Sequence, residues 1–352
     1  LWRDPTTLQI GVHPERALVL GGVGARAADL IAALDGTRDN ADLRATANML
    51  GFDAGVADRL IDLLVDASVV DDAAVDPSPM LGLSHLERDR LAPDLASISI
   101  ASGQTDAGIG TMRLRRQATV SGVGAGRVGA TVATLLAAAG VGLGVVDDPS
   151  TCRPADCAPG GLALADAGAS KAQAAHAAAH RASTSVCTSA LPEHSRFDLT
   201  VLAPPGALNP SLAEELVRAG VPHLLATVRE TTGIVGPMVV PGVSACLRCL
   251  DLHRADRDPS WPLLAAQLAT ESRRPAVQAC DVALATLVAS VAVLQVLTAI
   301  DSGDTTTNRR TELGKPSRPA KLPTHDGTLE VTLPDWRIRR RGWSPHPACG
   351  CQ

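Results

Sequence analysis

Aromatic side chains are nearly absent from this chain. Of its 352 residues none is tyrosine, two are phenylalanine and four are tryptophan, so aromatic residues make up 2% of the sequence. Aliphatic side chains must therefore fill the interior. The length is sufficient for two or three domains, each with a core of its own.

A strong charge of either sign is also missing. The formal net charge is −5 at pH 7, so bulk electrostatics favour neither nucleic acid nor an anionic membrane as a partner. The longest apolar run, residues 282–300, is long enough to suggest a membrane-spanning helix. The rest of the chain is typical of a soluble protein, so we expect a buried core helix here and no membrane partner.

An export signal is not visible in the sequence, which begins at Leu1 and leaves open whether residues precede it. We therefore expect a cytoplasmic protein whose eight cysteines remain free of disulfides. Cys152, Cys157 and Cys187 are expected to be structural. Cys280, just before the apolar run, is the one candidate nucleophile.

Four other cysteines occur in two close pairs, Cys246 with Cys249 and Cys349 with Cys351. The first pair has the C-x₂-C spacing of a zinc knuckle, and the second completes a set of four thiolates. Four thiolates close the tetrahedral shell of zinc and leave no open position, so the sequence predicts a structural zinc site. Such a site would tie the end of the chain to residues about 100 positions earlier, with a metal-linked folding free energy on the order of 10 kcal/mol.

Residues 1–76 read as one α+β domain. Two short strands within 8–20 precede three helical stretches, a pattern typical of a winged helix. The helical stretches are expected at 25–36, 41–51 and 56–70. The second of them carries only Arg44 as a base, and the unit is acidic, so we do not expect DNA binding.

Residues 77–115 read as a linker with a helix near 84–96. From 116 to 352, strands alternate with helices, which favours an α/β domain with a Rossmann-like, largely parallel, doubly wound sheet. Strands are expected at 117–123, 143–148, 197–205 and 221–228, hairpins at 233–242 and in the C-terminal tail, and helices at 127–139, 168–182 and 210–219.

A glycine-rich turn joins the first of these strands to the first helix. Gly124, Gly126 and Gly129 match G-x-G-x-x-G, in which glycine lets the backbone approach a phosphate while the helix N-terminus supplies N–H donors. The second strand ends in Asp147 and Asp148, where a ribose-binding carboxylate is expected. This spacing does not choose between NAD and ATP.

Taken together, the glycine turn, the aspartate-ended strand, the downstream Lys171 and the two cysteine pairs resemble the ThiF/MoeB family of ubiquitin-activating-like adenylating enzymes. The stretch 233–268 and the terminal His-Pro-Ala-Cys-Gly-Cys are similar to ThiF-like "cyclodehydratase" proteins of actinobacteria. These proteins are relatives of the partner proteins in thiazole/oxazole-modified microcin biosynthesis. The resemblance covers roughly residues 8–75 and 115–352.

The resemblance implies a division of labour. The N-terminal unit would be a peptide clamp that binds the leader of a precursor peptide as an added strand. The candidate edge is the hairpin at 8–20, with a groove lined by the helix at 56–69. The ThiF-like part would dock with a YcaO enzyme that performs the ATP chemistry, and family members form homodimers.

Two departures from active family members bear on ATP and magnesium. The stretch that should contain an arginine is 155–159, Ala-Asp-Cys-Ala-Pro, and the strand that should end in a magnesium-binding aspartate runs into Ala203-Pro204-Pro205. Loss of one preorganised group typically lowers a rate by about 10²–10³. Losing both groups should leave little adenylation, so we interpret the glycine turn as a retained structural feature. ATP and magnesium stay open as cofactors, with Asp147 placed to reach a ribose and Lys171 either to reach a phosphate or to be a solvated helix lysine.

Three functions remain. The first is a peptide-binding scaffold of a peptide-modification system whose adenylation chemistry is lost. The second is an active adenylating enzyme that acts on a C-terminal carboxylate as a homodimer. It would need a replacement arginine, either Arg127 or Arg153 or one donated in trans. The third is a winged-helix regulatory protein. A charged stretch at 250–262 is either a partner-docking loop or a salt-bridged crossover beside the zinc site.

Overall fold

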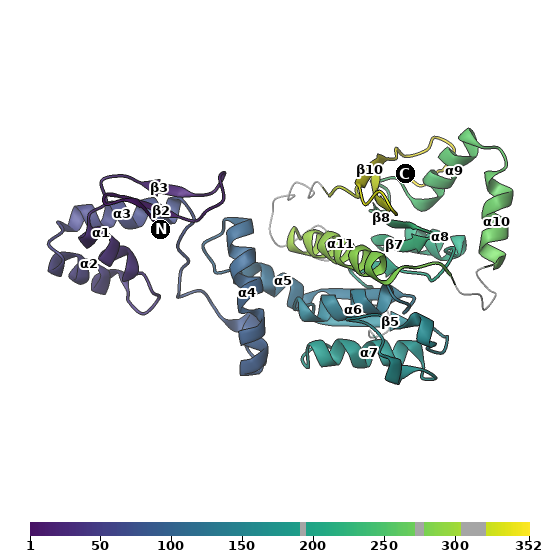
Figure 1. The fold of residues 1–352 in the computed structure, drawn as a ribbon, viewed down its shortest axis with the longest axis horizontal. Coiled ribbons are helices and arrows are strands. Elements are labelled where there is room, and N and C mark those ends of the chain that lie inside the picture. Colours follow the sequence, from purple (N-terminus) through teal and green to yellow (C-terminus); the bar gives the residue numbers. More distant parts are fainter. Residues whose placement is uncertain (191–194, 272–277, 304–321) are drawn as a thin grey trace. The chain divides into compact units, whose positions relative to one another are not determined.

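The computed structural model describes residues 1–190, 195–271, 278–303 and 322–352 of the chain. The chain divides into two compact units, Leu1–Met112 and Arg113–Gln352 (Figure 1).

The N-terminal unit begins with a three-stranded antiparallel sheet in the order β1-β2-β3, followed by three helices. Their bounds are β1 (Trp2–Asp4), β2 (Thr7–Ile10), β3 (Leu18–Leu20), α1 (Ala25–Ala32), α2 (Asn40–Met49) and α3 (Ala54–Asp66). The hairpin and the three helices expected from the sequence are confirmed, whereas β1 was not expected. The helices enclose a small core around Leu30, Ala47 and Ala57. The winged-helix assignment of this unit stays a prediction.

The segment expected to be a linker is folded. It contains a 3₁₀ turn η1 (Ser78–Met80) and the helices α4 (His85–Ser102) and α5 (Ile109–Gln117). Ser84 and Glu87 form a capping box at the start of α4. Leu91 and Ile98, two turns apart on α4, pack with Met80 and Met112. Because only three of the 18 residues of α4 are buried, and one of these is Glu87, the helical period is weak in the sequence.

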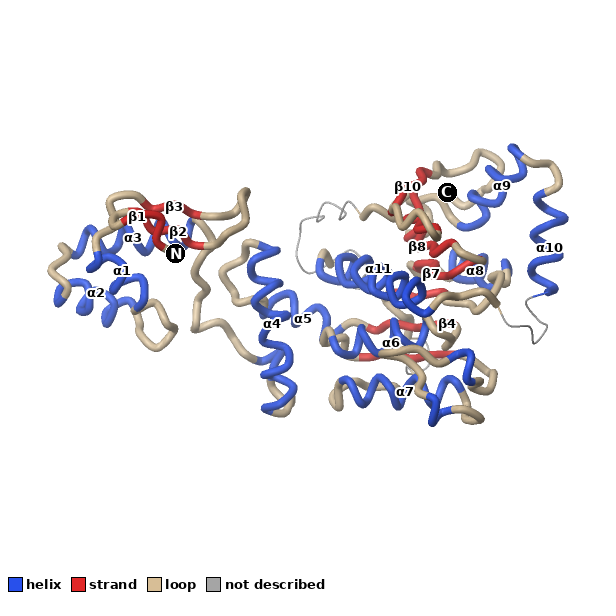
Figure 2. The backbone as a smooth tube through the Cα atoms, in the orientation of Figure 1, coloured by secondary structure: helices blue, strands red, loops and turns tan. Residues whose placement is uncertain are grey.

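The C-terminal unit is built on a seven-stranded sheet in the order β10-β9-β8-β7-β6-β4-β5, and Figure 2 shows its strands in red. β5, β4, β6 and β7 are parallel, and β8, β9 and β10 continue the sheet antiparallel. The bounds are β4 (Thr119–Val123), β5 (Leu143–Asp147), β6 (Leu199–Leu202), β7 (His223–Arg229), β8 (Thr232–Val239), β9 (Gly327–Thr332) and β10 (Ile338–Gly342). The expected α/β class with a largely parallel half is confirmed.

Helices cover both faces of this sheet. The connections β4-α6-β5 and β6-α8-β7 run in opposite directions along the sheet, so right-handed crossovers place α6 and α8 on opposite faces. α11 packs against α6, β7 and β8. The helices are α6 (Gly129–Ala138), α7 (Lys171–Ala182), α8 (Pro210–Arg218), α9 (Leu247–Arg257), α10 (Trp261–Glu271) and α11 (Val282–Asp301), with 3₁₀ turns η2 (Pro154–Asp156) and η3 (Leu164–Asp166).

The expected hairpin at 233–242 is wrong. Residues 233–239 belong to one strand, β8, that pairs with β7. The turn signal came from Gly236-Pro237, which instead lies where the register shifts: Leu224 pairs with Met238 and Ala226 with Val235. Two residues of β8 thus face one of β7, as in a β-bulge, and the bulge accommodates the Gly-Pro pair within the strand.

The apolar run forms the core helix that the sequence predicted. By length and composition α11 would suffice to cross a membrane, but 61% of its apolar window is buried inside the protein. Leu284, Val288, Ala292 and Val296 contact the same core as the strands β4, β6 and β7. The end of α11 is fixed by Asp301, which accepts two hydrogen bonds from the buried Arg115 guanidinium, at 2.8 and 2.7 Å.

Candidate functional site

The glycine turn at the end of β4 is formed by backbone packing. Gly124 adopts φ +94°, a conformation that favours glycine, and its N–H donates to the Asp147 carbonyl at 2.9 Å. A Cβ at Gly124 would overlap the carbonyl of Ala203, at the end of β6. A Cβ at Gly129 would overlap the carbonyl of Gly124 itself. The fold therefore requires these two glycines whether or not a nucleotide binds.

Gly126 differs from its two neighbours in the motif. Its φ is not in the left-handed region, and a Cβ there would meet only the Pro205 side chain, at an ordinary 3.9 Å. The packing of the fold therefore leaves room for a side chain at this position. Close approach of a phosphate would be a separate reason for glycine here.

Alanine substitutions at Gly124 and Gly126 test which of these glycines the packing of the fold requires. We expect Gly124→Ala to lower the free energy of unfolding by about 3 kcal/mol or more, because it combines backbone strain with steric overlap. Gly126→Ala, the matched control, should change it by less than about 1 kcal/mol. Urea unfolding of both variants measures the difference. Equal effects would contradict this account of the turn.

The two aspartates at the end of β5 have different environments. Asp147 is the last residue of the strand, and its side chain is exposed. Asp148 is 7% exposed; its carboxylate accepts a hydrogen bond from the Ala125 N–H at 2.8 Å and another from the Ser150 N–H at 2.9 Å. An N–H of the glycine turn is thus already bound to a carboxylate of the chain. The repeated aspartate was the only sequence signal of this role.

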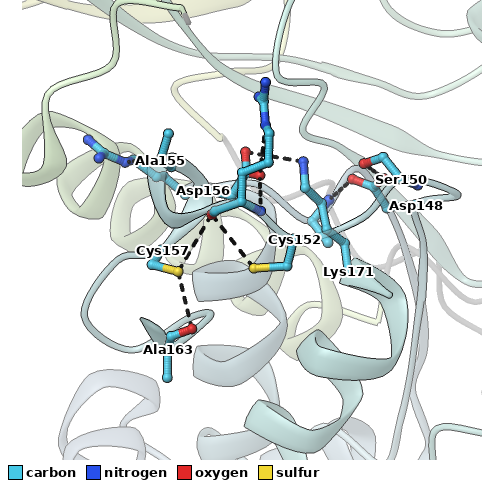
Figure 3. Close-up of polar contacts among 11 residues, drawn as sticks. Asp148, Ser150, Cys152, Ala155, Asp156, Cys157, Ala163 and Lys171 are labelled. Atoms are coloured by element: carbon cyan, nitrogen blue, oxygen red, sulfur yellow. Dashed lines mark hydrogen bonds and ion pairs between the residues drawn. The ribbon is translucent and has the colours of Figure 1, made fainter. Parts of the chain in front are cut away.

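Lys171 is not a solvated helix lysine. It is the first residue of α7, its side chain is 3% exposed, and its Nζ lies 3.1 Å from Oδ1 of Asp156 (Figure 3). Its own N–H donates to the Ser150 carbonyl at 3.0 Å, which ties the start of α7 to the loop after β5. The solvated reading failed because the sequence does not show that this loop folds over the lysine.

Asp156 is the partner that the sequence analysis missed. It lies in η2, within the stretch where active family members are expected to carry an arginine. Burial raises the pKa of Asp156. Hydrogen bonds from the Arg153 N–H and from Lys171, together with the Lys171 charge, lower this pKa by more than burial raises it, so it lies below its usual value. The Asp156 carboxyl group is therefore ionised at neutral pH and faces Nζ of Lys171.

Both candidate replacement arginines, Arg127 and Arg153, interact with groups of their own chain. Arg127 donates to the carbonyls of Ala155, at 2.8 Å, and Cys280, at 2.6 Å. Arg153 lies 3.4 Å from the Asp156 carboxylate. The end of β6 continues as Ala203-Pro204-Pro205, without a carboxylate.

The ion pair between Lys171 and Asp156 should contribute to stability in a pH-dependent way. Breaking a buried pair from one side costs about 3–5 kcal/mol, so Asp156→Asn and Lys171→Met should each destabilise the chain by about that much. Asp156→Asn combined with Lys171→Met should cost less than the sum of the two. Chemical unfolding gives all three values, and additive effects would contradict the pair.

The pH dependence follows from the direction of the pKa shift. Because the folded pKa of Asp156 is lowered, its contribution is present above the unfolded value of about 3.9 and is lost as pH falls through the folded pKa. Asp156→Asn should therefore lose more stability at pH 7 than near pH 2. A penalty that does not depend on pH would contradict this assignment.

The four paired cysteines come together as expected. Sγ of Cys246 lies 3.7 Å from Sγ of Cys249 and 3.4 Å from that of Cys349, and Cys249 and Cys351 are 3.4 Å apart at their Sγ atoms. All four sulfurs lie within 4.8 Å of one another. Around a tetrahedral zinc ion with bonds of about 2.3 Å the sulfurs would be about 3.8 Å apart. The donor set therefore fits zinc, with α9 supplying one pair and the C-terminal tail the other.

The environment of the cluster supports metal ligation. Burial raises the pKa of the Cys246 thiol to about 11. At Cys249 burial acts the same way, but N–H groups of His346 and Cys246 that donate to the sulfur outweigh it, so the pKa of Cys249 is lowered. A metal ion supplies the positive charge that buried thiolates otherwise lack. Zinc remains the proposed identity.

Metal removal tests the structural role of this site. The purified protein should contain one zinc ion per chain by elemental analysis. Cys249→Ser should lose that ion and lower the midpoint of thermal unfolding by several degrees. This corresponds to a loss on the order of a few kcal/mol in the free energy of unfolding. Cys187→Ser, at an exposed thiol, is the control and should retain the zinc. A full zinc content in Cys249→Ser would contradict the site.

Cys280 and Cys152 show no sign of nucleophilic activation. Burial raises the pKa of Cys280, the candidate nucleophile, although the nearby Arg127 opposes this. Burial and the neighbouring Cys157 raise the pKa of Cys152 to about 11. Both thiols are therefore protonated at neutral pH, and the thiolate is the reactive form.

Comparisons with known proteins find similar folds among solved structures. No family model and no curated protein matches the sequence. Among solved structures, PaaA is 18% identical with a TM-score of 0.66, and 98% of each chain is covered. The microcin C7 biosynthetic enzyme MccB in complex with N-formylated MccA is 14% identical with a TM-score of 0.63, covering 98% of this chain and 97% of that one. E. coli MccB with ATP is 15% identical with a TM-score of 0.60 and the same coverage.

At these identities the likeness concerns the fold, over nearly the whole chain. The fold includes the N-terminal unit, which the matched structures also cover. The resemblance inferred from the glycine turn and the cysteine pairs is therefore confirmed at the level of architecture: this chain has a ThiF/MoeB-like fold, shared with MccB and PaaA.

Proposed function

We propose that this chain is a peptide-binding scaffold of a peptide-modification system, with the ThiF-like fold retained and the adenylation chemistry lost. Its partners would be a precursor peptide and a YcaO-like cyclodehydratase enzyme. The observation that carries the proposal is the buried pair between Lys171 and Asp156, at 3.1 Å. A lysine neutralised in this way is not available to a triphosphate without separating two buried charges.

Two further features support the loss of adenylation. The Asp148 carboxylate already accepts the Ala125 N–H of the glycine turn, and β6 ends without a metal-binding carboxylate. An anionic nucleotide would meet two buried carboxylates, Asp148 and Asp156, in place of the arginine and the magnesium ion that the resemblance leads one to expect. Electrostatic preorganisation for phosphate is therefore weak.

The N-terminal unit offers an edge for the peptide. β3 is an outer strand of its sheet, so one side of its backbone has no strand partner among the described residues. Val19 of β3 and Leu63 of α3 are each 44% exposed, and Val56 is 39% exposed. An extended leader peptide could add to β3 through main-chain hydrogen bonds and place an apolar side chain beside Val19. MccB, which has a similar fold, has been solved with its peptide MccA.

Calorimetry with ATP and magnesium tests the loss of adenylation. The zinc-loaded chain should show no binding up to millimolar ATP, because the lysine and the glycine turn are already neutralised by Asp156 and Asp148. E. coli MccB, which has been solved with ATP, is the positive control. Micromolar binding by this chain would overturn the silent-scaffold proposal.

The peptide half of the proposal is tested separately. A candidate leader peptide should slow amide hydrogen exchange of Leu18–Leu20 in the full chain, because an added strand protects the edge of β3. Protection confined to the C-terminal unit would contradict a clamp at β3.

A second candidate function is an active adenylating enzyme acting as a homodimer on a C-terminal carboxylate. The observation that favours it is the fold it shares with MccB, which has been solved both with ATP and with AMPCPP and MccA. Because Arg127 and Arg153 are bound to their own chain, this function would require an arginine from a second subunit. ATP binding together with pyrophosphate exchange would establish it.

A further inference from the structure

A cavity of about 510 Å³ lies beside the cysteine cluster in the C-terminal unit, away from the glycine turn's own residues. Its walls come from α8, α9 and α10, and Leu225 and Arg229 of β7 also line it. Cys246, Cys349 and Cys351 lie at its border. Neither the proposed peptide edge nor the nucleotide motif accounts for this cavity.

The walls of the cavity are largely apolar. α10 contributes Trp261, Ala265 and Leu268, which are spaced four and three residues apart and so share one face of the helix. α8 contributes Ala213 and Val217, again four apart. Leu268 is 37% exposed, so part of this apolar surface is open to solvent. An apolar side chain of a ligand would be buried between the two helices.

Positive charge is concentrated around this apolar space. Four arginines line the cavity, against the carboxylates of Glu214 and Asp251, although the whole chain has a net charge of −5. Asp251 is already bound on one oxygen: Arg254 donates to it at 3.0 Å and the Trp261 indole at 3.1 Å. The Arg254 guanidinium also lies 5.0 Å from the centre of the Trp261 ring. The remaining arginines are Arg218, Arg229 and Arg248.

Arg218, Arg229 and Arg248 each form no ion pair with any residue of the described ranges. Of the three, Arg229 ends β7, and it is exposed. Desolvation by the surrounding protein and the neighbouring Arg254 lower the pKa of Arg229, while the carboxylates of Asp251, Glu230 and Glu330 oppose this shift. A guanidinium remains charged at neutral pH. A cysteine cluster that holds zinc is itself anionic, and Arg248, adjacent to Cys249 in the sequence, adjoins it.

We propose that this cavity binds an acidic peptide segment, with an apolar side chain against Trp261 and Leu268 and a carboxylate at Arg229. A planar guanidinium binds a carboxylate through two parallel hydrogen bonds, which fixes orientation as well as charge. This site goes beyond the proposed function, which places its peptide on the edge strand β3 of the other unit. The two sites can therefore be tested independently.

Two acetylated, amidated pentapeptides serve as probes: Leu-Glu-Leu-Glu-Leu and its counterpart with glutamine in place of glutamate. Titration calorimetry with the full, zinc-loaded chain should show at least tenfold tighter binding of the glutamate peptide. Arg229→Gln should remove most of that difference. Arg337→Gln is the matched control, because Arg337 is 76% exposed and lies outside the cavity; it should leave the preference unchanged.

Three results would overturn the proposal: equal binding of the two peptides, no binding at millimolar concentration, or a glutamate preference that persists in Arg229→Gln. Leu18→Pro, which disturbs β3, should not alter the preference; if it does, the peptide lies on the N-terminal sheet instead. Size-exclusion chromatography of the wild type and Arg229→Gln tests whether a second copy of the chain occupies the cavity. A dimer that dissociates in the variant would show that the cavity holds a second copy of the chain, and this too would overturn the proposal.

Discussion

Backbone packs directly on backbone where the first strand of the C-terminal sheet turns into its first helix. Gly124 lies against the carbonyl of Ala203, and Gly129 lies against the carbonyl of Gly124, with no room for a Cβ in either place. The contact holds β4, α6 and the end of β6 in register. Because the constraint is steric, it persists whether or not a nucleotide is bound. The presence of the glycine motif in this sequence is therefore compatible with a lost activity.

Acidic side chains complete that picture. Asp148 accepts an N–H of the turn, and Asp156 pairs with Lys171, so the groups that would receive an anion are already matched by carboxylates of the chain. The loop that carries Asp156 is tied down by Arg127, which donates to Ala155 and to Cys280. The chain thus stabilises this end of the sheet with its own charges. Elsewhere in the C-terminal unit, the four paired cysteines lie where the C-terminal tail meets α9, beside a cavity lined by four arginines.

The sequence predicted the features that depend on local pattern. The alternation of strands and helices, the core helix α11 and the convergence of Cys246, Cys249, Cys349 and Cys351 all follow from periodicity and spacing. What it did not reveal depends on contacts between distant residues. Lys171 reads as exposed until the loop carrying Asp156 is folded over it, and Gly236-Pro237 reads as a turn until β7 pairs across the bulge. The cavity beside Arg229 is formed by α8, α9, α10 and the end of β7, which no single stretch of sequence brings together.

The most direct test of whether the nucleotide site has become architecture is a crystal structure of the zinc-loaded chain grown with magnesium and the ATP analogue AMPCPP. The account predicts that no nucleotide is seen at the glycine turn, that Nζ of Lys171 stays beside Asp156, and that Asp148 keeps the Ala125 N–H. Density for the analogue, with Lys171 turned from Asp156 to a phosphate, would contradict it. The chain would then have to be regarded as an adenylating enzyme.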